Sequence, residues 1–229
     1  PNAHTRANDL SHPRQGQKMD VTLIGSPFSP YTRAAAVTAI ERGVDYRLDP
    51  IGPAELRHPS YTEKHPFRRL PALSVDGHRI YETAAIMRYL DSIGTKGASL
   101  QPSDPIAQAQ SDQWMSAANS YLYAHAFNNF AFMRTFAPAF EIRVDEERLA
   151  DSKERTSVYL AIVNRAIEDG EIGRKQRLTL GDIFAGTILM PLGTFDEGKA
   201  LLAEQPSAEN WISELSARPS FELTDAKPG

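Results

Sequence analysis

The segment from residue 21 to residue 40 constrains the fold of this chain more than any other. Residues 21–24 have the aliphatic character of a short buried strand, and residues 33–40 form an alanine-rich helical pattern. Between these two runs, Ser29 stands where a helix N-cap is expected, and Pro30 stands at the first helical position. The sequence therefore predicts a buried strand, a tight turn and a helix that begins at this serine.

The predicted helix start also has chemical consequences. Its sequence, Ser29-Pro30-Tyr31-Thr32, has hydroxyl groups where a thiol-redox loop would carry cysteines, and the whole chain contains no cysteine. The free amide groups and the positive dipole end of a helix N-terminus favour a nearby anion, and a thiolate is such an anion. We therefore expect this loop to bind a sulfur atom that the protein itself does not supply.

The segments that follow predict a small α/β unit. Strand-like alternation, a hairpin signal at Asp76-Gly77 and an amphipathic helical pattern succeed one another up to residue 93. The expected elements are a strand at Tyr46 and Leu48, a short helix near Ser60, strands at 70–75 and 78–81, and a helix at 82–93. With the first strand and helix, they have the β-α-β-α-β-β-α order of a thioredoxin-like domain.

The second half of the chain has helical patterns only. It follows a stretch rich in glycine, serine and proline at 94–105, which is typical of a domain linker. The expected helices lie at 105–135, 151–170 and 179–192, near Glu197 and at 207–217. Thr179 and Asp182 predict a capping box at the start of the third of them. The sequence thus predicts an α/β domain followed by an all-α domain.

The domain bounds follow from these patterns. We expect a disordered leader at 1–18, a thioredoxin-like domain at 19–94, a linker at 95–105 and an all-helical C-terminal domain at 106–229. The leader is almost free of apolar residues, so it cannot provide the apolar region of a secretion signal.

Composition excludes several classes of function. With 25 basic and 29 acidic residues and a formal net charge of -4, the chain has no global basic field that would recruit nucleic acid or anionic lipid. No apolar stretch approaches the roughly 20 residues that span a bilayer. The lack of cysteine excludes disulfides, thiolate zinc sites and a protein-thiol redox mechanism, and it fits a reducing compartment. Because His58, His65, His78 and His125 lack metal-site spacing, we expect a small-molecule partner and no metal.

Four motifs, taken in their order and spacing, carry a resemblance to a known family. They are Ser29-Pro30-Tyr31-Thr32-Arg33 after the first strand, the run His65 to Leu73, the hairpin Asp76-Gly77, and Glu82-Thr83 ahead of the helical run Ala85 to Leu90. From about Met19 to about Thr224 the chain resembles the cytosolic glutathione transferases, with serine-type bacterial, phi-like and nu-like members as the nearest match. The resemblance implies the glutathione transferase fold, which joins a thioredoxin-like domain to a helical one.

The resemblance also implies a function. It suggests a glutathione transferase that binds reduced glutathione as a co-substrate and activates its thiolate for attack on a small hydrophobic electrophile. It further implies a cytoplasmic homodimer that acts in detoxification, with no nucleic-acid or membrane partner. A non-catalytic scaffold or ligand-binding protein that kept the fold is the alternative. His65, Arg68 and Arg69 keep this alternative open, because relatives often have Asn-Pro-x-Gly-Gln or Asn-Pro-x-Gly-Lys at this place.

Ser29 is the predicted catalytic residue. In the family a Ser, Tyr or Cys at this position donates a hydrogen bond to the glutathione sulfur, and such a bond lowers the pKa of the thiol. A helix N-terminus lowers that pKa further. The alternative is a plain N-cap serine without a chemical role. Ser26 and Tyr31 are rivals for the same task.

Six further residues are predicted to bind glutathione. By resemblance, Pro71 is the family's cis-proline, which turns the backbone of Leu70 toward the ligand. Thr83 would bind the γ-glutamyl carboxylate and Glu82 would orient its ammonium group. Arg69 and Arg57 would meet carboxylates of the peptide. The alternatives are a trans-proline at a strand start, an ordinary helix-capping pair at 82–83, and a solvated surface arginine at 57.

A second pocket is expected on the helical side. The run from Tyr121 to Arg134 is unusually aromatic, and pockets for apolar ligands are lined by such side chains. Some of these aromatic side chains should line the electrophile pocket, while most should fill the core or a dimer interface. The spacing alone does not show which side chains face the pocket.

Overall fold

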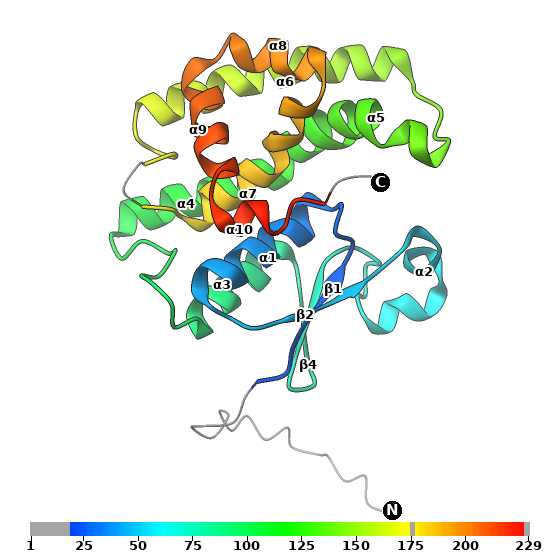
Figure 1. The fold of residues 1–229 in the computed structure, drawn as a ribbon, viewed down its shortest axis with the longest axis vertical. Coiled ribbons are helices and arrows are strands. Elements are labelled where there is room, and N and C mark those ends of the chain that lie inside the picture. The colour runs from blue at the N-terminus through cyan, green and yellow to red at the C-terminus, as the bar shows by residue number, and fades with distance from the viewer. Residues whose placement is uncertain (1–18, 175–176, 227–229) are drawn as a thin grey trace, which may run out of the picture.

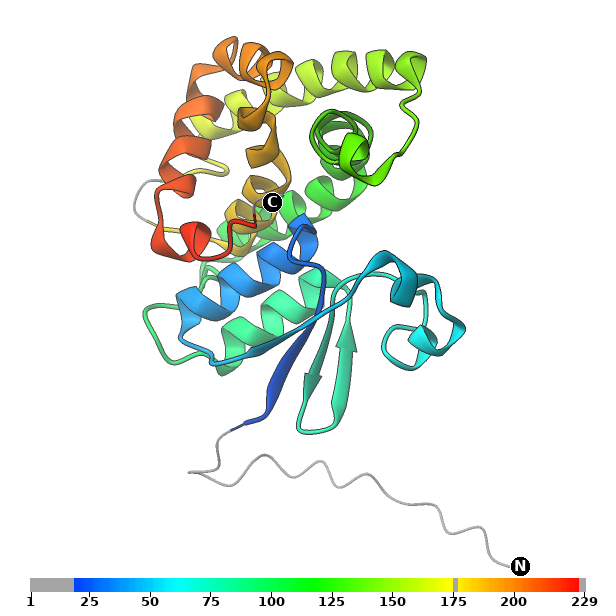
Figure 2. The ribbon, with the colours of Figure 1, turned by 45° about the vertical axis from the view of Figure 1, so that its right-hand side comes forward.

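The computed structural model describes residues 19–174 and 177–226, so the expected leader at 1–18 lies outside the described residues. The chain forms two layers that lie one above the other in Figure 1, a small sheet domain and a larger helical one. Two helices of the first domain lie between its sheet and the helical domain, as the rotated view shows (Figure 2).

The first domain contains one four-stranded mixed sheet. Its strands are β1 (Val21–Gly25), β2 (Arg47–Pro50), β3 (Ala72–Val75) and β4 (His78–Tyr81), in the order β2-β1-β3-β4. β1 pairs with β2 in parallel and with β3 antiparallel, and β3 pairs antiparallel with β4. A parallel pair needs a crossover connection, and here helix α1 provides it. The expected α/β order is confirmed.

Helices make up most of the rest. Those of the first domain are α1 (Pro30–Arg42), α2 (Pro53–Arg57), the 3₁₀ helix η1 (Pro59–Glu63) and α3 (Thr83–Ile93). Those of the second are α4 (Pro105–Ala117), the π-helix η2 (Ala118–Ala131), α5 (Phe132–Thr135), η3 (Ala137–Phe140), α6 (Glu146–Glu168), α7 (Leu180–Leu189), η4 (Met190–Thr194), α8 (Asp196–Ala203), α9 (Pro206–Ser216) and α10 (Pro219–Glu222). In its described part the second domain has no strand, as the sequence predicts.

Helix α1 is built from the residues that predicted it, and it extends the alanine-rich run at 33–40 on both sides. Ser29 is its N-cap, with extended backbone and a side chain that accepts from the amide of Thr32, and Pro30 is its first residue. Gly43 ends the helix in the left-handed conformation, which glycine adopts at little cost. The small face at Ala34 and Val37 packs toward the helical domain, so the main core continues from one domain into the other.

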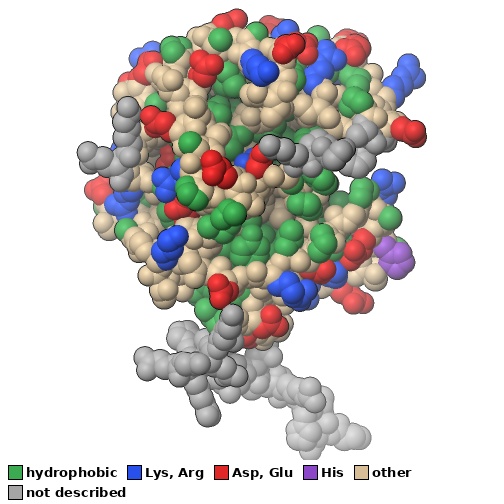
Figure 3. All heavy atoms as spheres, in the orientation of Figure 1, with side chains coloured by type: hydrophobic (Ala, Val, Ile, Leu, Met, Phe, Trp, Pro, Cys, Tyr) green, Lys and Arg blue, Asp and Glu red, His purple; other side chains and the backbone are tan. Residues whose placement is uncertain are grey.

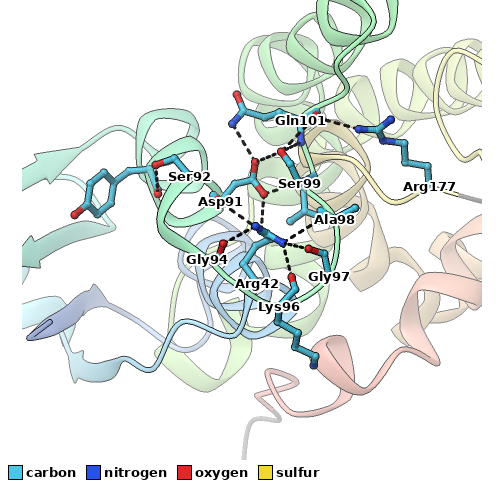
Figure 4. Close-up of polar contacts among 12 residues, drawn as sticks. Arg42, Asp91, Ser92, Gly94, Lys96, Gly97, Ala98, Ser99, Gln101 and Arg177 are labelled. Carbon is cyan, nitrogen blue, oxygen red and sulfur yellow. Dashed lines mark hydrogen bonds and ion pairs between the residues drawn. The ribbon is translucent and has the colours of Figure 1, made fainter. Parts of the chain in front are cut away.

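A buried ion pair holds the segment that leads from the first domain to the second (Figure 4). The Nε of Arg42 lies 2.8 Å from Oδ1 of Asp91, and the two side chains are only 7% and 1% exposed. The Arg42 guanidinium donates to the carbonyls of Gly94, Lys96, Gly97 and Ala98. Asp91 accepts from the amide of Leu100 and from the side chains of Ser99 and Gln101. Residues 94–101 are therefore tied to both α1 and α3.

The long helices of the second domain differ from the expected pattern, and its last short helix, α10, was not expected. The run expected at 105–135 is one continuous helical segment, but its middle is the π-helix η2 instead of an α-helix. The helix expected at 151–170 starts earlier, at Glu146, because Asp145 caps it by accepting from the amide of Arg148. The capping box of Thr179 and Asp182 at the start of α7 is confirmed.

No helix in the described ranges 19–174 and 177–226 is both long and apolar enough to cross a membrane. The domain bounds at residues 94 and 105 stay a prediction.

Candidate functional site

A cavity of about 1420 Å³ lies between the two domains. Figure 3 shows hydrophobic side chains gathering across the middle of one face, between the upper and the lower lobe. All seven predicted site residues line this cavity, namely Ser29, Arg57, Arg69, Leu70, Pro71, Glu82 and Thr83. They come from four separate segments of the first domain, so the fold brings together residues that are up to 54 positions apart in the chain, from 29 to 83.

Ser29 lies at the cavity end of helix α1 and is half-buried. Its Oγ accepts from the amide of Thr32 at 3.4 Å, a long hydrogen bond, and among the described residues its hydroxyl proton has no acceptor. No acidic residue stands in the first turn of α1, so the positive end of the helix is not neutralised there. A bound anion would meet both a hydroxyl donor and a positive helix end at this point.

The rival hydroxyls differ from Ser29 in their bonding. Tyr31 donates its hydroxyl proton to Oδ1 of Asn119 at 2.9 Å, and its ring stacks on Tyr123 at 4.4 Å between centroids. Burial, followed by the neighbouring Tyr123 and Glu82, raises the pKa of Tyr31 far above that of a free tyrosine. Ser26 also lines the cavity, and its Oγ accepts from the amide of Phe28 at 3.4 Å. The Tyr31 proton is therefore already engaged, whereas the two serine protons are free among the described residues.

The backbone before β3 presents a free edge to the cavity. The peptide bond between Leu70 and Pro71 is cis, as the resemblance implied. The hydroxyl of Tyr61 donates to the carbonyl of Arg69 at 3.1 Å and so anchors the preceding residue. Within the described part of the chain, neither the N–H nor the C=O of Leu70 is hydrogen-bonded, so both can pair with an extended ligand.

Glu82 and Thr83 form the start of helix α3. Glu82 adopts a positive φ of 71° and its side chain makes no capping hydrogen bond, so an ordinary capping role does not explain it. Thr83 is the first helical residue and is buried. Because the first amide groups of a helix lack intrahelical acceptors, this end of α3 offers N–H donors beside a hydroxyl. The pair can hold one carboxylate and one ammonium group.

Two exposed arginines line the cavity. Arg57 ends α2 and Arg69 lies two residues before the cis-proline, and neither guanidinium is paired with an acid in the described part of the protein. Arg68 has the positive φ of 49° that glycine readily adopts, so arginine there still allows the turn. Both Arg57 and Arg69 are placed to meet an anionic ligand.

The opposite wall of the cavity comes from the helical domain, and sequence patterns did not reveal which of its side chains face inward. In a π-helix each amide bonds to the fifth residue before it, and the amide of Phe132 does so to the carbonyl of Phe127. Side chains four or five positions apart therefore share a face. The lining residues of this segment are Asn119, Tyr123, Phe127, Asn128 and Phe132. Phe130 is fully buried in the core instead, and Tyr121 is exposed.

A second hollow of about 1300 Å³ adjoins the first, and Phe28 and Pro30 are among the residues that line both. Met190 and Phe221 are among its apolar lining residues. Arg33 at its edge donates to the carbonyl of Phe221 at 2.9 Å and pairs with Asp225 at 3.3 Å. The C-terminal segment is thereby fastened to α1 beside the site.

The donor set of the site is not that of a metal centre. No group of three or more His, Asp or Glu side chains within residues 19–174 and 177–226 lies close enough to hold a metal ion. The cavity offers hydroxyls, backbone amides, two arginines and aromatic rings. Such a set suits an anionic peptide next to an apolar group.

Comparison with known proteins identifies relatives over nearly the whole chain. The family model described as glutathione S-transferase, N-terminal domain, matches residues 23–96. A glutathione S-transferase of Arabidopsis thaliana is 32% identical over 170 residues, which cover 72% of this chain and 78% of the relative. Glutathione S-transferase 3 of Zea mays is 26% identical over 210 residues, covering 89% and 92%. These plant relatives support the phi-like resemblance.

Solved structures share the fold. A theta class glutathione S-transferase of Xanthomonas axonopodis pv. citri, determined with glutathione bound, is 25% identical with a TM-score of 0.77, over 91% of this chain and 98% of that one. A glutathione transferase of Populus trichocarpa is 23% identical with a TM-score of 0.79, over 89% and 96%. The expected fold class is confirmed, while the roles of the individual site residues stay predictions.

Proposed function

This chain belongs to the glutathione S-transferase family, and we propose that it is an active transferase which binds reduced glutathione in the cavity between its domains. The observation that carries the proposal is the convergence of all seven predicted site residues on one cavity. One wall of that cavity is aromatic. The opposite wall offers an exposed backbone edge, two unpaired cations and two helix starts. A scaffold that had lost its ligand would have no need for such a set of unpaired groups.

The first domain would hold the peptide by its polar ends. The backbone of Leu70 pairs with the extended ligand, as a strand edge pairs with a neighbouring strand. Thr83 and the first amides of α3 bind the γ-glutamyl carboxylate, and Glu82 orients the ammonium group of the same residue. Arg57 and Arg69 meet the remaining negative charge. Each of these contacts stabilises the bound reactants and the transition state equally. Together they therefore set the affinity for glutathione and not the rate of the chemical step.

The chemistry would take place at the N-terminus of α1. The Ser29 hydroxyl donates a hydrogen bond to the glutathione sulfur, and the helix end favours its negative charge, so the thiolate form dominates at neutral pH. The thiolate forms a new C–S bond with the electrophile, and the leaving group departs with the electron pair of the bond that breaks. Proximity and orientation supply a further part of the rate.

The electrophile would lie against the helical wall. Tyr123, Phe127 and Phe132 present aromatic surface there, with the Asn119 and Asn128 amides as the polar groups nearby. An apolar wall with few polar groups suits a small hydrophobic electrophile. Detoxification of such compounds is the corresponding biological task.

We also propose a homodimer that acts in the cytoplasm. Family membership is the main ground for both statements. Phe67, a residue that is 68% exposed, supports the dimer. Its ring contacts Tyr81, and the two leave an apolar surface that a second copy would cover. Sedimentation of the purified protein gives the oligomeric state directly.

Replacing Ser29 by alanine tests the proposed function. Turnover of a model aromatic halide should fall about 100-fold, in line with the loss of one donor to a developing or stabilised anion, with little change in the affinity for glutathione. The ultraviolet absorbance of bound thiolate at neutral pH should fall with it.

Ser26→Ala and Tyr31→Phe are the matched controls. Both remove a hydroxyl from the same cavity, and both should keep turnover within about threefold of the wild-type value. Tyr31 already donates its proton to Asn119, and Ser26 lies three residues before the N-cap of α1, away from the positive helix end. If Ser29→Ala keeps full turnover while one control loses it, the catalytic residue is misassigned. If the wild-type protein neither binds glutathione nor turns over any halide, the scaffold alternative is correct.

A further inference from the structure

His65 occupies an unusual place in the candidate site. It lines the cavity, yet the residue as a whole is only 1% exposed. It follows η1 and opens the turn that leads into the cis-proline, where relatives often have asparagine. The proposed function gives this buried imidazole no role.

The imidazole is built into the turn as a hydrogen-bond acceptor. Its Nδ1 accepts from the amide of Phe67 at 3.2 Å, two residues further on. The carbonyl of His65 accepts from the amide of Arg68 at 2.9 Å, and its own amide donates to the carbonyl of Tyr61 at the same distance. These bonds close the turn on both sides of Pro66.

The bond to Phe67 determines the protonation state of the ring. Nδ1 can accept only when it carries no proton, so the ring must be neutral with its proton on Nε2. Protonation would put a second N–H donor against the amide of Phe67, and the bond would be lost. An asparagine Oδ1 accepts from the second following amide in the same way, but it does not titrate near neutral pH.

The surroundings favour the neutral ring. Burial lowers the pKa of His65, with Glu82 at the start of α3 opposing this effect and Arg69 of the same turn reinforcing it. From β4, the ring of Tyr81 lies 5.3 Å from the imidazole between centroids. Phe67 contacts it edge-on at 6.3 Å. Lys64 directly precedes His65 and is paired with Asp49 and Glu55, and Arg68 follows three residues later.

We propose that His65 is a positioning residue of the glutathione site, whose neutral imidazole holds the turn from His65 to Arg69 and so places the Leu70 backbone edge and the Arg69 side chain. The inference rests on the proposed function, because the ligand that the turn serves is glutathione. It gives the site a proton-sensitive element that an asparagine at this position would lack. At pH values below the pKa of His65, the ring is protonated and the bond from the Phe67 amide is lost. The Leu70 backbone edge is then no longer held in place, and the affinity for glutathione falls.

S-methylglutathione is the probe for this role, since it keeps the peptide contacts but has no thiol to ionise. Calorimetry of the full chain from about pH 7.5 to about pH 5 compares the wild-type protein with His65→Asn and His65→Phe. The wild-type affinity should fall about fivefold on acidification, which corresponds to one ordinary hydrogen bond. His65→Asn should bind at neutral pH within about twofold of wild type, with little dependence on pH. His65→Phe, which keeps an aromatic ring but no acceptor, should bind about fivefold more weakly throughout.

A second measurement does not depend on any variant. The ¹⁵N shifts of the imidazole in the ligand-free wild-type protein should show the neutral ring with its proton on Nε2 at neutral pH. A proton on Nδ1 overturns the proposal, as does an affinity that rises in acid or an acid loss that His65→Asn shares. Normal binding at neutral pH with a flat wild-type pH profile overturns the role of His65 alone. No binding of the probe at any pH overturns the proposed function as well.

Discussion

The two walls of the cavity are built in different ways. On the first-domain side, Ser29, Leu70 and Thr83 each stand at a helix start or a turn, and the backbone itself supplies much of the binding surface. On the helical side, one π-helix presents whole side chains, with Tyr123 and Phe127 in the cavity. The first wall has unpaired polar groups that await a ligand, whereas the second has aromatic surface.

This difference separates two tasks. A peptide with fixed charges and amides requires fixed partners, and helix starts and turns place such partners with little freedom. A set of varied apolar compounds requires shape and contact area, which aromatic side chains supply without directional bonds. The first wall should therefore set the affinity for glutathione and the second wall the affinity for the electrophile. The segment between the domains connects the two walls.

The largest expected effect comes from breaking the connection between the walls. Arg42→Ala leaves the Asp91 carboxylate buried without its cation and removes four carbonyl contacts from residues 94–98. Removing one partner of a buried pair costs about 3 to 5 kcal/mol. Urea unfolding of the variant should show a loss of this size in the free energy of unfolding.

Arg88→Gln is the matched control for that experiment. Arg88 of α3 is also paired with an acid, in this case Asp112 of α4 in the second domain, but both side chains are about 40% exposed. Exposed pairs contribute about 0 to 1 kcal/mol, so this variant should unfold almost as the wild type does. Equal losses in both variants would show that burial of the Arg42 pair is not what holds the linker.

A pair of variants tests the division of tasks directly. Thr83→Val removes one hydroxyl from the first wall, and the KM for glutathione should rise about tenfold while the KM for the halide stays unchanged. Tyr123→Leu removes an aromatic ring from the second wall, and the KM for the halide should rise about threefold to tenfold with that for glutathione unchanged. Steady-state kinetics with each substrate varied in turn measures all four values. Crossed effects would contradict the separation of the two walls.

The smallest expected effect concerns the turn that leads into the first wall. Arg68 is held at a φ of 49°, where a side chain costs roughly 1 kcal/mol that glycine avoids. Arg68→Gly should raise the free energy of unfolding by about that amount, as urea unfolding measures, and leave glutathione affinity within about twofold. A loss of affinity would mean that the Arg68 side chain itself contacts the ligand.

Local patterns account for the helix starts and the hairpin around which the site is built. Ser29 with Pro30 marks a helix start wherever it stands, and Asp76-Gly77 marks a hairpin, because the responsible forces act within a few residues. The spacing of these signals along the chain sufficed for the α/β order. The capping box at Thr179 and Asp182 followed from the same local logic. The seven site residues that line one cavity were assigned by resemblance to the family, not by local pattern.

Other features depend on contacts between distant segments. Nothing in the run from Tyr121 to Arg134 predicts a π-helix, and a different helical repeat changes which aromatic rings face the cavity. That Tyr31 gives its proton to Asn119, 88 residues away, and that His65 accepts from Phe67 at the edge of the cavity, became visible only in the folded chain. The sequence by itself determined where the backbone turns and begins its helices, because those choices are local. The tertiary structure decided which hydroxyls stay free and which rings meet the ligand, because packing between domains sets those directions.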